Sequence, residues 1–238
     1  MKKIIVLAIL FAPCITVAGD RLILSAAKDN TLYETVDGSV SNGAGAWTFI
    51  GLTTQGLRRS IVSFDVSDLD ACDSITAVRA IFTIDMAPAS SSAGTAGLHL
   101  VLQDWGEGTS DAGSPGGQGV ASTTDDATWI HSFFNTSSWT NAGGDFMSMA
   151  SAQAAFNTQS DDVLNFTSTD LLIDDVRGWV NNPSSNYGWV ILGDEINLRN
   201  SRRLISKDSA SKLTPTLIID YVPGGECIFE NGFEPLLR

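Results

Sequence analysis

The stretch Ala77-Val-Arg-Ala-Ile-Phe-Thr-Ile84 decides the fold class, because its apolar residues follow a period of two. The side chains at every second position are apolar: Val78, Ala80, Phe82 and Ile84. Successive side chains of a β-strand point to opposite faces, so this spacing predicts a half-buried strand.

Further stretches with strand-like composition lie on both sides of this one, separated by Gly, Pro, Asn and Ser. They are Arg21–Ala26, Trp47–Leu52, Arg59–Phe64, Leu98–Leu102, Gly188–Leu192 and Thr216–Tyr221. Many short strands with such punctuation are typical of an all-β protein, either an antiparallel sandwich or a barrel.

One or two short helices interrupt the strand pattern. Thr169-Asp170 can cap a helix, and the apolar residues that follow lie on one helical face: Leu172, Ile173, Val176, Trp179 and Val180. The run Asn181-Asn-Pro-Ser-Ser185 ends it. A second helix is expected at 148–156, where Ala and Gln favour that state.

Composition and charge exclude several classes of protein. Of 238 residues, 43% are hydrophobic and 17% are charged, which argues against intrinsic disorder. The chain has 14 Lys and Arg against 27 Asp and Glu, a net charge of −13. Binding to nucleic acid needs Lys and Arg to neutralise phosphates, so the sequence predicts no nucleic-acid partner.

Residues 1–19 have the pattern of a secretory signal peptide. The basic Met1-Lys-Lys3 precedes an apolar run from Ile4 to Val17 and the small residues Ala18-Gly19. We expect a secreted protein, extracellular, periplasmic or at the cell surface of a bacterium. Loss of two Lys residues lowers the basic count from 14 to 12, which changes the net charge from −13 to −15.

The exported chain is expected to form one domain, residues 20–222, with a tail at 223–238. No later stretch is apolar for long enough to span a membrane. Cleavage leaves two cysteines, Cys72 and Cys227. In an oxidising compartment they can form one disulfide; the alternative is two separate thiols.

Residues 103–147 differ in composition from the rest of the chain. They contain 8 Gly and 12 Ser or Thr, yet they also hold Trp105, Trp129 and Trp139. A long connection with aromatic residues of this kind is more often a packed or functional loop region than a linker.

Several motifs, taken in chain order, resemble those of DNRLRE domains. They are GLTTQGLRRSIVSFDVSDL at 51–69, Asp104-Trp-Gly-Glu-Gly108, Asp126-Ala-Thr-Trp129, Trp139 with Gly143-Gly-Asp-Phe146, Asn186-Tyr-Gly188 and Pro215–Tyr221. The resemblance covers residues 27–221. It implies a jelly-roll-like antiparallel β-sandwich, related to disaggregatase repeats and to a family of carbohydrate-binding modules.

One segment departs from the family pattern. The family's Phe-x-Ser-Arg-Glu is Leu204-Ile-Ser-Lys-Asp208 in this chain. Lys cannot reproduce the planar, bidentate fork of Arg, which puts in doubt any role that depends on that Arg.

The sequence contains no familiar catalytic motif. The two histidines, His99 and His131, have no partner at a metal-binding or catalytic spacing. Adjacent acids occur at Asp125-Asp126, Asp161-Asp162 and Asp174-Asp175, but such pairs arise by chance among 27 acids and usually lie in solvent. We predict that the protein is not an enzyme.

A binding function fits the residues better. Sugars present apolar C–H faces and hydroxyl rims, which aromatic platforms and hydrogen-bonding side chains recognise. The ligand-binding candidates are Trp105, Trp129, Trp139, Arg58 and Arg59. The alternatives are core positions for the Trp residues and, for an arginine, an ion pair with Asp65, Asp104 or Glu107.

Calcium is a candidate cofactor, because oxygen ligands are frequent in the loop region. The candidate ligands are Asp104, Glu107, Asp111, Asp125, Asp126 and Asp145. The alternative is an acidic surface without a metal.

These observations predict an exported, non-catalytic module that binds a cell-surface or extracellular polysaccharide. The glycan follows from the resemblance to DNRLRE domains. The first alternative is a structural or adhesive protein whose partner is another envelope protein. A secreted polysaccharide hydrolase or lyase is the second.

Overall fold

The computed structural model describes residues 19–224, so nearly all of the predicted signal peptide, Cys227 and most of the predicted tail lie outside the described residues. The Cys72–Cys227 disulfide therefore stays a prediction. The elements within this range are β1 (Asp20–Tyr33), β2 (Val40–Ser41), β3 (Trp47–Thr53), β4 (Gly56–Phe64), β5 (Ser74–Met86), β6 (Gly94–Leu100), β7 (Val120–Ala121), β8 (His131–Phe133), β9 (Ser137–Ser138), β10 (Ala152–Phe156), β11 (Val163–Phe166), α1 (Asp170–Asn181), a 3₁₀ turn (Pro183–Ser185), β12 (Trp189–Leu192), β13 (Arg202–Ile205) and β14 (Thr216–Val222).

The strands form an antiparallel β-sandwich, which confirms the predicted fold class. One layer contains the first half of β1 with β14, β5 and β11. The other contains the second half of β1 with β4, β12, β6 and β10. Strands β3 and β13 join the two layers, because β4 pairs with β3, β3 with β13, and β13 with β5.

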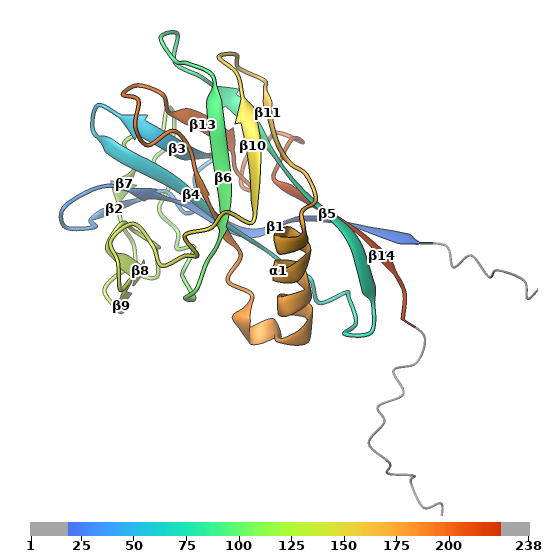
Figure 1. Cartoon of the computed structure of the whole chain (residues 1–238). Helices are drawn as coiled ribbons and strands as arrows, with labels where there is room; N and C mark the ends of the chain where they lie inside the picture. Colours follow the sequence, from blue (N-terminus) through green and yellow to red (C-terminus); the bar gives the residue numbers. More distant parts are fainter. Residues whose placement is uncertain (1–18, 225–238) are drawn as a thin grey trace, which may run out of the picture.

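Strand β1 belongs to both layers. Its residues 20–25 pair with β14, and its residues 26–33 pair with β4 (Figure 1). The register shifts between Ala26 and Lys28. An irregularity of this kind bends a strand and increases its twist, which lets one strand pass from one layer to the other.

The main core lies between the two layers. The alternation expected along β5 is confirmed, since Val78, Ala80, Phe82 and Ile84 are all at most 1% exposed. These side chains belong to one apolar cluster with residues of the second layer such as Val62, Leu98 and Trp189. Burying each large apolar side chain stabilises the fold by roughly 1.5–3 kcal/mol.

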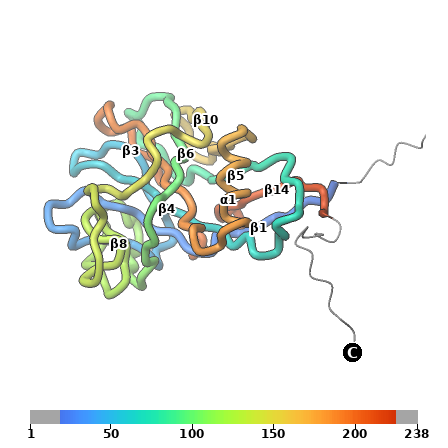
Figure 2. Tube along the Cα trace, turned by 60° about the horizontal axis from the view of Figure 1, so that its bottom comes forward, coloured from blue at the N-terminus to red at the C-terminus, as the bar shows by residue number. Residues whose placement is uncertain are grey.

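The helix expected after Thr169 is confirmed as α1, which lies beside β5 (Figures 1 and 2). Leu172, Val176 and Trp179 form its buried face, and the Trp179 ring centroid lies 4.4 Å from that of Trp189. In the range 19–224, no helix combines the length and the apolar character needed to cross a bilayer.

The helix expected at 148–156 is wrong. The chain there forms β10, which pairs with β6. Ala152, Ala154 and Phe156 are buried, whereas the residues between them are exposed. This period of two fills the core, and tertiary packing overrides the helix propensity of Ala and Gln.

Residues 101–147 form an additional layer over the outer face of the second sheet. That face presents Leu32, Ile61 and Val190, which are all buried in a second apolar cluster. Figure 2 shows the region around β8 lying alongside β4. We call residues 101–147 the loop lobe. It makes β4 a strand buried on both sides.

Thr169 couples the start of α1 to Ser151, the residue before β10, through a single hydroxyl. Its Oγ1 accepts the Leu172 N–H at 3.0 Å and donates to the Ser151 carbonyl at 2.5 Å. We expect Thr169→Ala to lower the free energy of unfolding by about 1–2 kcal/mol, as measured by urea denaturation. Thr169→Ser is the matched control and should stay within a few tenths of the original. Equal losses in both variants would contradict this role of the hydroxyl.

Candidate functional site

The three tryptophans proposed as ligand platforms lie in the second apolar cluster. Trp105 is fully buried, and Trp129 and Trp139 are less than 10% exposed. The Trp105 Nε1–H donates to the Tyr187 carbonyl at 2.8 Å, and the Trp139 Nε1–H donates to the Thr128 carbonyl at 2.9 Å. The rings therefore attach the loop lobe to β4 and β12, and a sugar could stack on them only after the lobe rearranged.

Arg59 holds the same lobe from the β4 side. Its guanidinium binds Glu195 with two hydrogen bonds, at 2.7 and 3.0 Å, and donates to the Gly143 carbonyl at 2.8 Å. It also lies over the Trp129 ring, 4.8 Å from the centroid. The ion pair considered for the arginines with Asp65, Asp104 or Glu107 is thus corrected to a pair with Glu195.

A groove of about 540 Å³ opens on the surface of the described residues. Its floor crosses three neighbouring strands, because Arg203 of β13 pairs with Phe49 of β3 on one side and with Met86 of β5 on the other. The Arg203 guanidinium pairs with Asp85 and lies over the Trp47 ring, 4.4 Å from the centroid. We call this feature the β13 groove.

A glycine-rich wall encloses the β13 groove on the side of the loop lobe. Gly116 has a φ of +72°, which favours glycine, and a Cβ atom there would lie 3.5 Å from the Phe49 ring. The Tyr33 hydroxyl donates to the Gly116 carbonyl at 2.9 Å, and Arg58 Nε donates to the Gly117 carbonyl at 3.3 Å. Arg58 is only 3% exposed, so the structure shows it supporting the groove wall from behind.

The lining of the β13 groove combines apolar and hydrogen-bonding residues. The apolar part consists of Phe49, Met86, Pro88, Ala112 and Pro115. The hydrogen-bonding side chains of the lining are Thr53, Gln55, Gln118, Ser201 and Arg203. Pockets that bind small molecules have this composition, in which apolar contacts give affinity and a few polar groups give orientation.

The six acids proposed as calcium ligands serve separate purposes. Asp126 is buried and accepts the Thr123 N–H at 2.5 Å, and burial raises the pKa of its carboxyl. Asp145 accepts the N–H groups of Thr140 and Asn141; burial raises the pKa of Asp145, but these hydrogen bonds outweigh burial and lower it overall.

The remaining acids of that set lie nearer to solvent. Asp104 forms an ion pair with Lys28 at 3.1 Å, Asp111 accepts the Gly113 N–H at 2.8 Å, and Asp125 is exposed. Of the six, only Glu107 belongs to a group of three carboxylates within residues 19–224.

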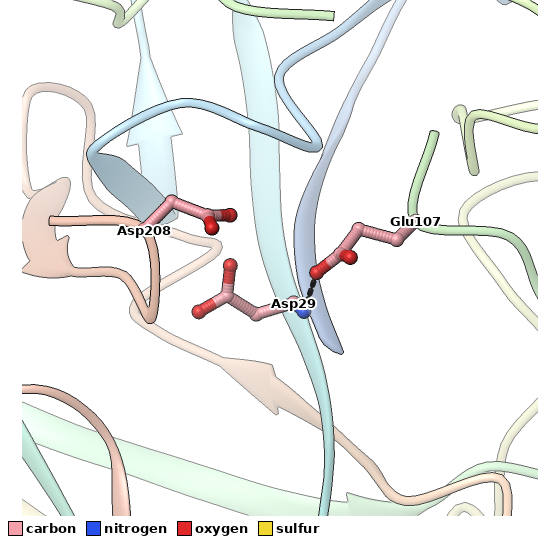
Figure 3. Close-up of side chains that lie close together, drawn as sticks. All are labelled: Asp29, Glu107 and Asp208. Carbon is pink, nitrogen blue, oxygen red and sulfur yellow. Dashed lines mark hydrogen bonds between the residues drawn. The ribbon is translucent and has the colours of Figure 1, made fainter. Parts of the chain in front are cut away.

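That group consists of Asp29, Glu107 and Asp208, which come from β1, the loop lobe and the connection after β13 (Figure 3). One oxygen of each carboxylate lies within 4.8 Å of the others. Glu107 Oε1 accepts the Asp29 N–H at 2.8 Å. Burial raises the pKa of the Asp29 carboxyl to about 8, although a hydrogen bond from the Lys207 N–H opposes this, and burial also raises the pKa of Glu107.

Sequence analysis did not select Asp29 or Asp208. The available signal was the Leu204–Asp208 segment, in which a basic and an acidic residue lie side by side at Lys207 and Asp208. In the structure the Lys207 Nζ lies 3.2 Å from Glu107 and 2.9 Å from Asp208. The segment therefore places the compact positive charge of a lysine ammonium among the carboxylates.

Comparison with protein-family models and with curated proteins returned no match to this chain. The resemblance to DNRLRE domains accordingly stays a prediction that depends on the motifs quoted above.

The burial of Trp105 predicts a large effect on stability. We expect Trp105→Ala to lower the free energy of unfolding by about 3–5 kcal/mol, because it leaves a cavity under the loop lobe and an unpaired Tyr187 carbonyl. Urea denaturation followed by circular dichroism measures this. Met149→Ala is the control, since Met149 is exposed. A stable Trp105→Ala protein would contradict the core role.

Asp194 orders the segment that leads to Ser201 in the lining of the β13 groove. Its carboxylate accepts the Ile196 and Asn197 N–H groups at 2.9 Å and the Asn200 side-chain amide at 2.7 Å. Burial raises the pKa of Asp194, but these hydrogen bonds outweigh burial and lower the pKa from 3.8 to about 2.

The lowered pKa of Asp194 predicts how the free energy of unfolding depends on pH. A carboxyl with a depressed folded-state pKa stabilises the fold above its unfolded value of 3.8, and this stabilisation is lost as the pH falls through about 2. We expect the wild type to be more stable than Asp194→Asn at pH 5, and the difference to shrink steadily towards pH 2. Urea denaturation of both proteins across this range measures it. A difference that is independent of pH would contradict the assignment.

Proposed function

We infer that the protein is an exported, non-catalytic module that binds a neutral or weakly charged polysaccharide outside a bacterial cell. The single observation that supports this function best is the β13 groove. It is open enough for part of a chain-like ligand, and its lining suits the chemistry of a sugar ring.

The apolar and the hydrogen-bonding residues of the groove suit different parts of a sugar ring. Met86 is 42% exposed and, with the edge of Phe49, offers an apolar surface to a C–H face. Gln55, Gln118 and Ser201 of the lining carry groups that both donate and accept hydrogen bonds, as hydroxyl groups require. A ring lying flat on the floor would direct its hydroxyls toward these side chains.

Charge narrows the class of polysaccharide. The only cationic side chain in the groove lining is Arg203, and its charge is already balanced by Asp85. With a net charge of −13 for the whole chain, an anionic polymer would be repelled over the length of the surface. Neutral glycans face no such repulsion. The secretory pattern of residues 1–19 supports a ligand outside the cell.

Substitutions in the groove test this function. We expect the wild type to be retarded in native gels that contain its polysaccharide. Met86→Ala and the double variant Gln55→Ala/Gln118→Ala should each weaken binding about tenfold or more, because contacts of about 1–2 kcal/mol are removed. Met149→Ala and Gln153→Ala are matched controls, since both side chains are exposed and neither lines the groove.

Several outcomes would contradict the proposal. Polysaccharide binding that survives every groove substitution would exclude this groove as the site. Failure to bind any polysaccharide, together with co-purification of an envelope protein, would favour the structural or adhesive alternative. Turnover of a polysaccharide, lost on substitution of one carboxylate, would show an enzyme.

A further inference from the structure

We propose that Asp29, Glu107 and Asp208 form a binding site for one divalent cation, with Ca²⁺ as the ion that fits best. This site differs from the six-acid set considered from the sequence, with which it shares only Glu107. It lies outside the lining of the β13 groove, so the proposal does not depend on polysaccharide binding.

The three carboxylates converge from segments far apart in the sequence. One oxygen from each lies within 4.8 Å of the others. Ca²⁺ binds oxygen ligands at 2.3–2.6 Å, so ligands on opposite sides of the ion can be about 5 Å apart. One Ca²⁺ can therefore contact all three carboxylates. Oxygen-only ligands favour a hard cation such as Ca²⁺ or Mg²⁺ over zinc or copper.

Asp29 supplies a second and independent indication of a ligand. Its side chain is 1% exposed, and its Oδ2 accepts the Lys207 N–H at 2.7 Å. Its Oδ1 is buried and has no hydrogen-bond partner among the described residues. A buried carboxylate oxygen without a partner is costly, and a bound cation would remove this cost. Figure 3 shows the Asp29 carboxylate directed toward Asp208.

The charges around the site match a divalent ion. When all three carboxylates are ionised, they and the Lys207 ammonium carry a net charge of −2. Lys207 contacts Glu107 and Asp208 from the end of a flexible stem, and its side chain is partly exposed. Its ammonium can therefore move aside into solvent when a cation enters, whereas its backbone N–H, which holds Asp29, stays in place.

Occupation of the site would tie the loop lobe to the sandwich. Glu107 belongs to the lobe, Asp29 to β1, and Asp208 to the connection that leads into β14. A cation that binds only the folded chain stabilises it by mass action, so calcium should raise the melting temperature.

Titration calorimetry of the EDTA-treated and dialysed full chain with CaCl2 tests the proposal. We expect one ion per chain, with a dissociation constant of about 10⁻⁴–10⁻³ M, as in other extracellular modules. Asp208→Asn should weaken binding about tenfold or more, because it removes one anionic ligand at a partly exposed position. Asp111→Asn is the matched control, because it also removes one carboxylate, lies in the loop lobe with Glu107 and can keep its hydrogen bond to Gly113.

The Lys207→Gln variant distinguishes a cation-binding site from a cluster of carboxylates whose charge is neutralised by Lys207 alone. If a cation competes with the ammonium, removing the ammonium should tighten calcium binding several-fold. Asp29→Asn should abolish calcium binding if this variant folds. If it does not fold, the calcium affinity of Asp208→Asn still tests the site.

Three results would overturn the assignment. The first is no heat and no change in melting temperature for the folded wild type in millimolar CaCl2. The second is equal calcium affinity in Asp208→Asn and the wild type. The third is tighter binding of MgCl2 than of CaCl2 at matched ionic strength, which would exclude calcium as the preferred ion. Loss of polysaccharide binding in groove variants with calcium affinity unchanged would show that the two sites are separate.

Discussion

The burial of β4 on both faces is the constraint on which the rest of the structure depends. Its neighbouring residues Ile61 and Val62 point in opposite directions, and both are about 1% exposed. Val62 faces the main core, and Ile61 faces the second cluster. A sandwich sheet needs only one covered face, so the second demands an extra layer. The loop lobe supplies it through Trp105, Trp129 and Trp139.

Both candidate sites follow from the way the loop lobe is packed. After Trp105 is inserted, Glu107 lies next to Asp29 and the chain continues to the glycine-rich wall against Phe49. Arg58, whose strand lies beneath the lobe, supports that wall. The tryptophans thus contribute indirectly to any binding function, because they hold in place the segments that form the sites.

Periodicity predicted the elements whose signal is local. The alternation along 77–84 and the helical face after Thr169 are both present as expected. Strand β13 was missed because its first residue, Arg202, is a charged side chain that the sequence marks as exposed. The structure buries it over the Phe156 ring, with carbonyl acceptors from Ser92 and Asn157. The contacts that offset the cost of burying this charge come from residues distant in the sequence.

The candidate sites were harder to predict for the same reason. Aromatic residues in a Gly- and Ser-rich region are compatible both with a sugar-binding platform and with a buried core. Which of the two they form depends on whether another surface of the protein covers them. Glu195 lies 136 positions from Arg59, so their pairing has no local signature. The convergence of Asp29, Glu107 and Asp208 requires the register of three separate segments, which composition and spacing do not specify.

Native-state hydrogen exchange tests the central claim, that the loop lobe is a packed layer of the fold. The amides of Gly106, Ala127 and Trp139 donate to carbonyls within the lobe. The account predicts that they are protected nearly as strongly as the amides of β4, and that they open together. Exchange of these amides within seconds, while β4 stays protected, would show that the lobe is not packed on the sheet and would contradict the account.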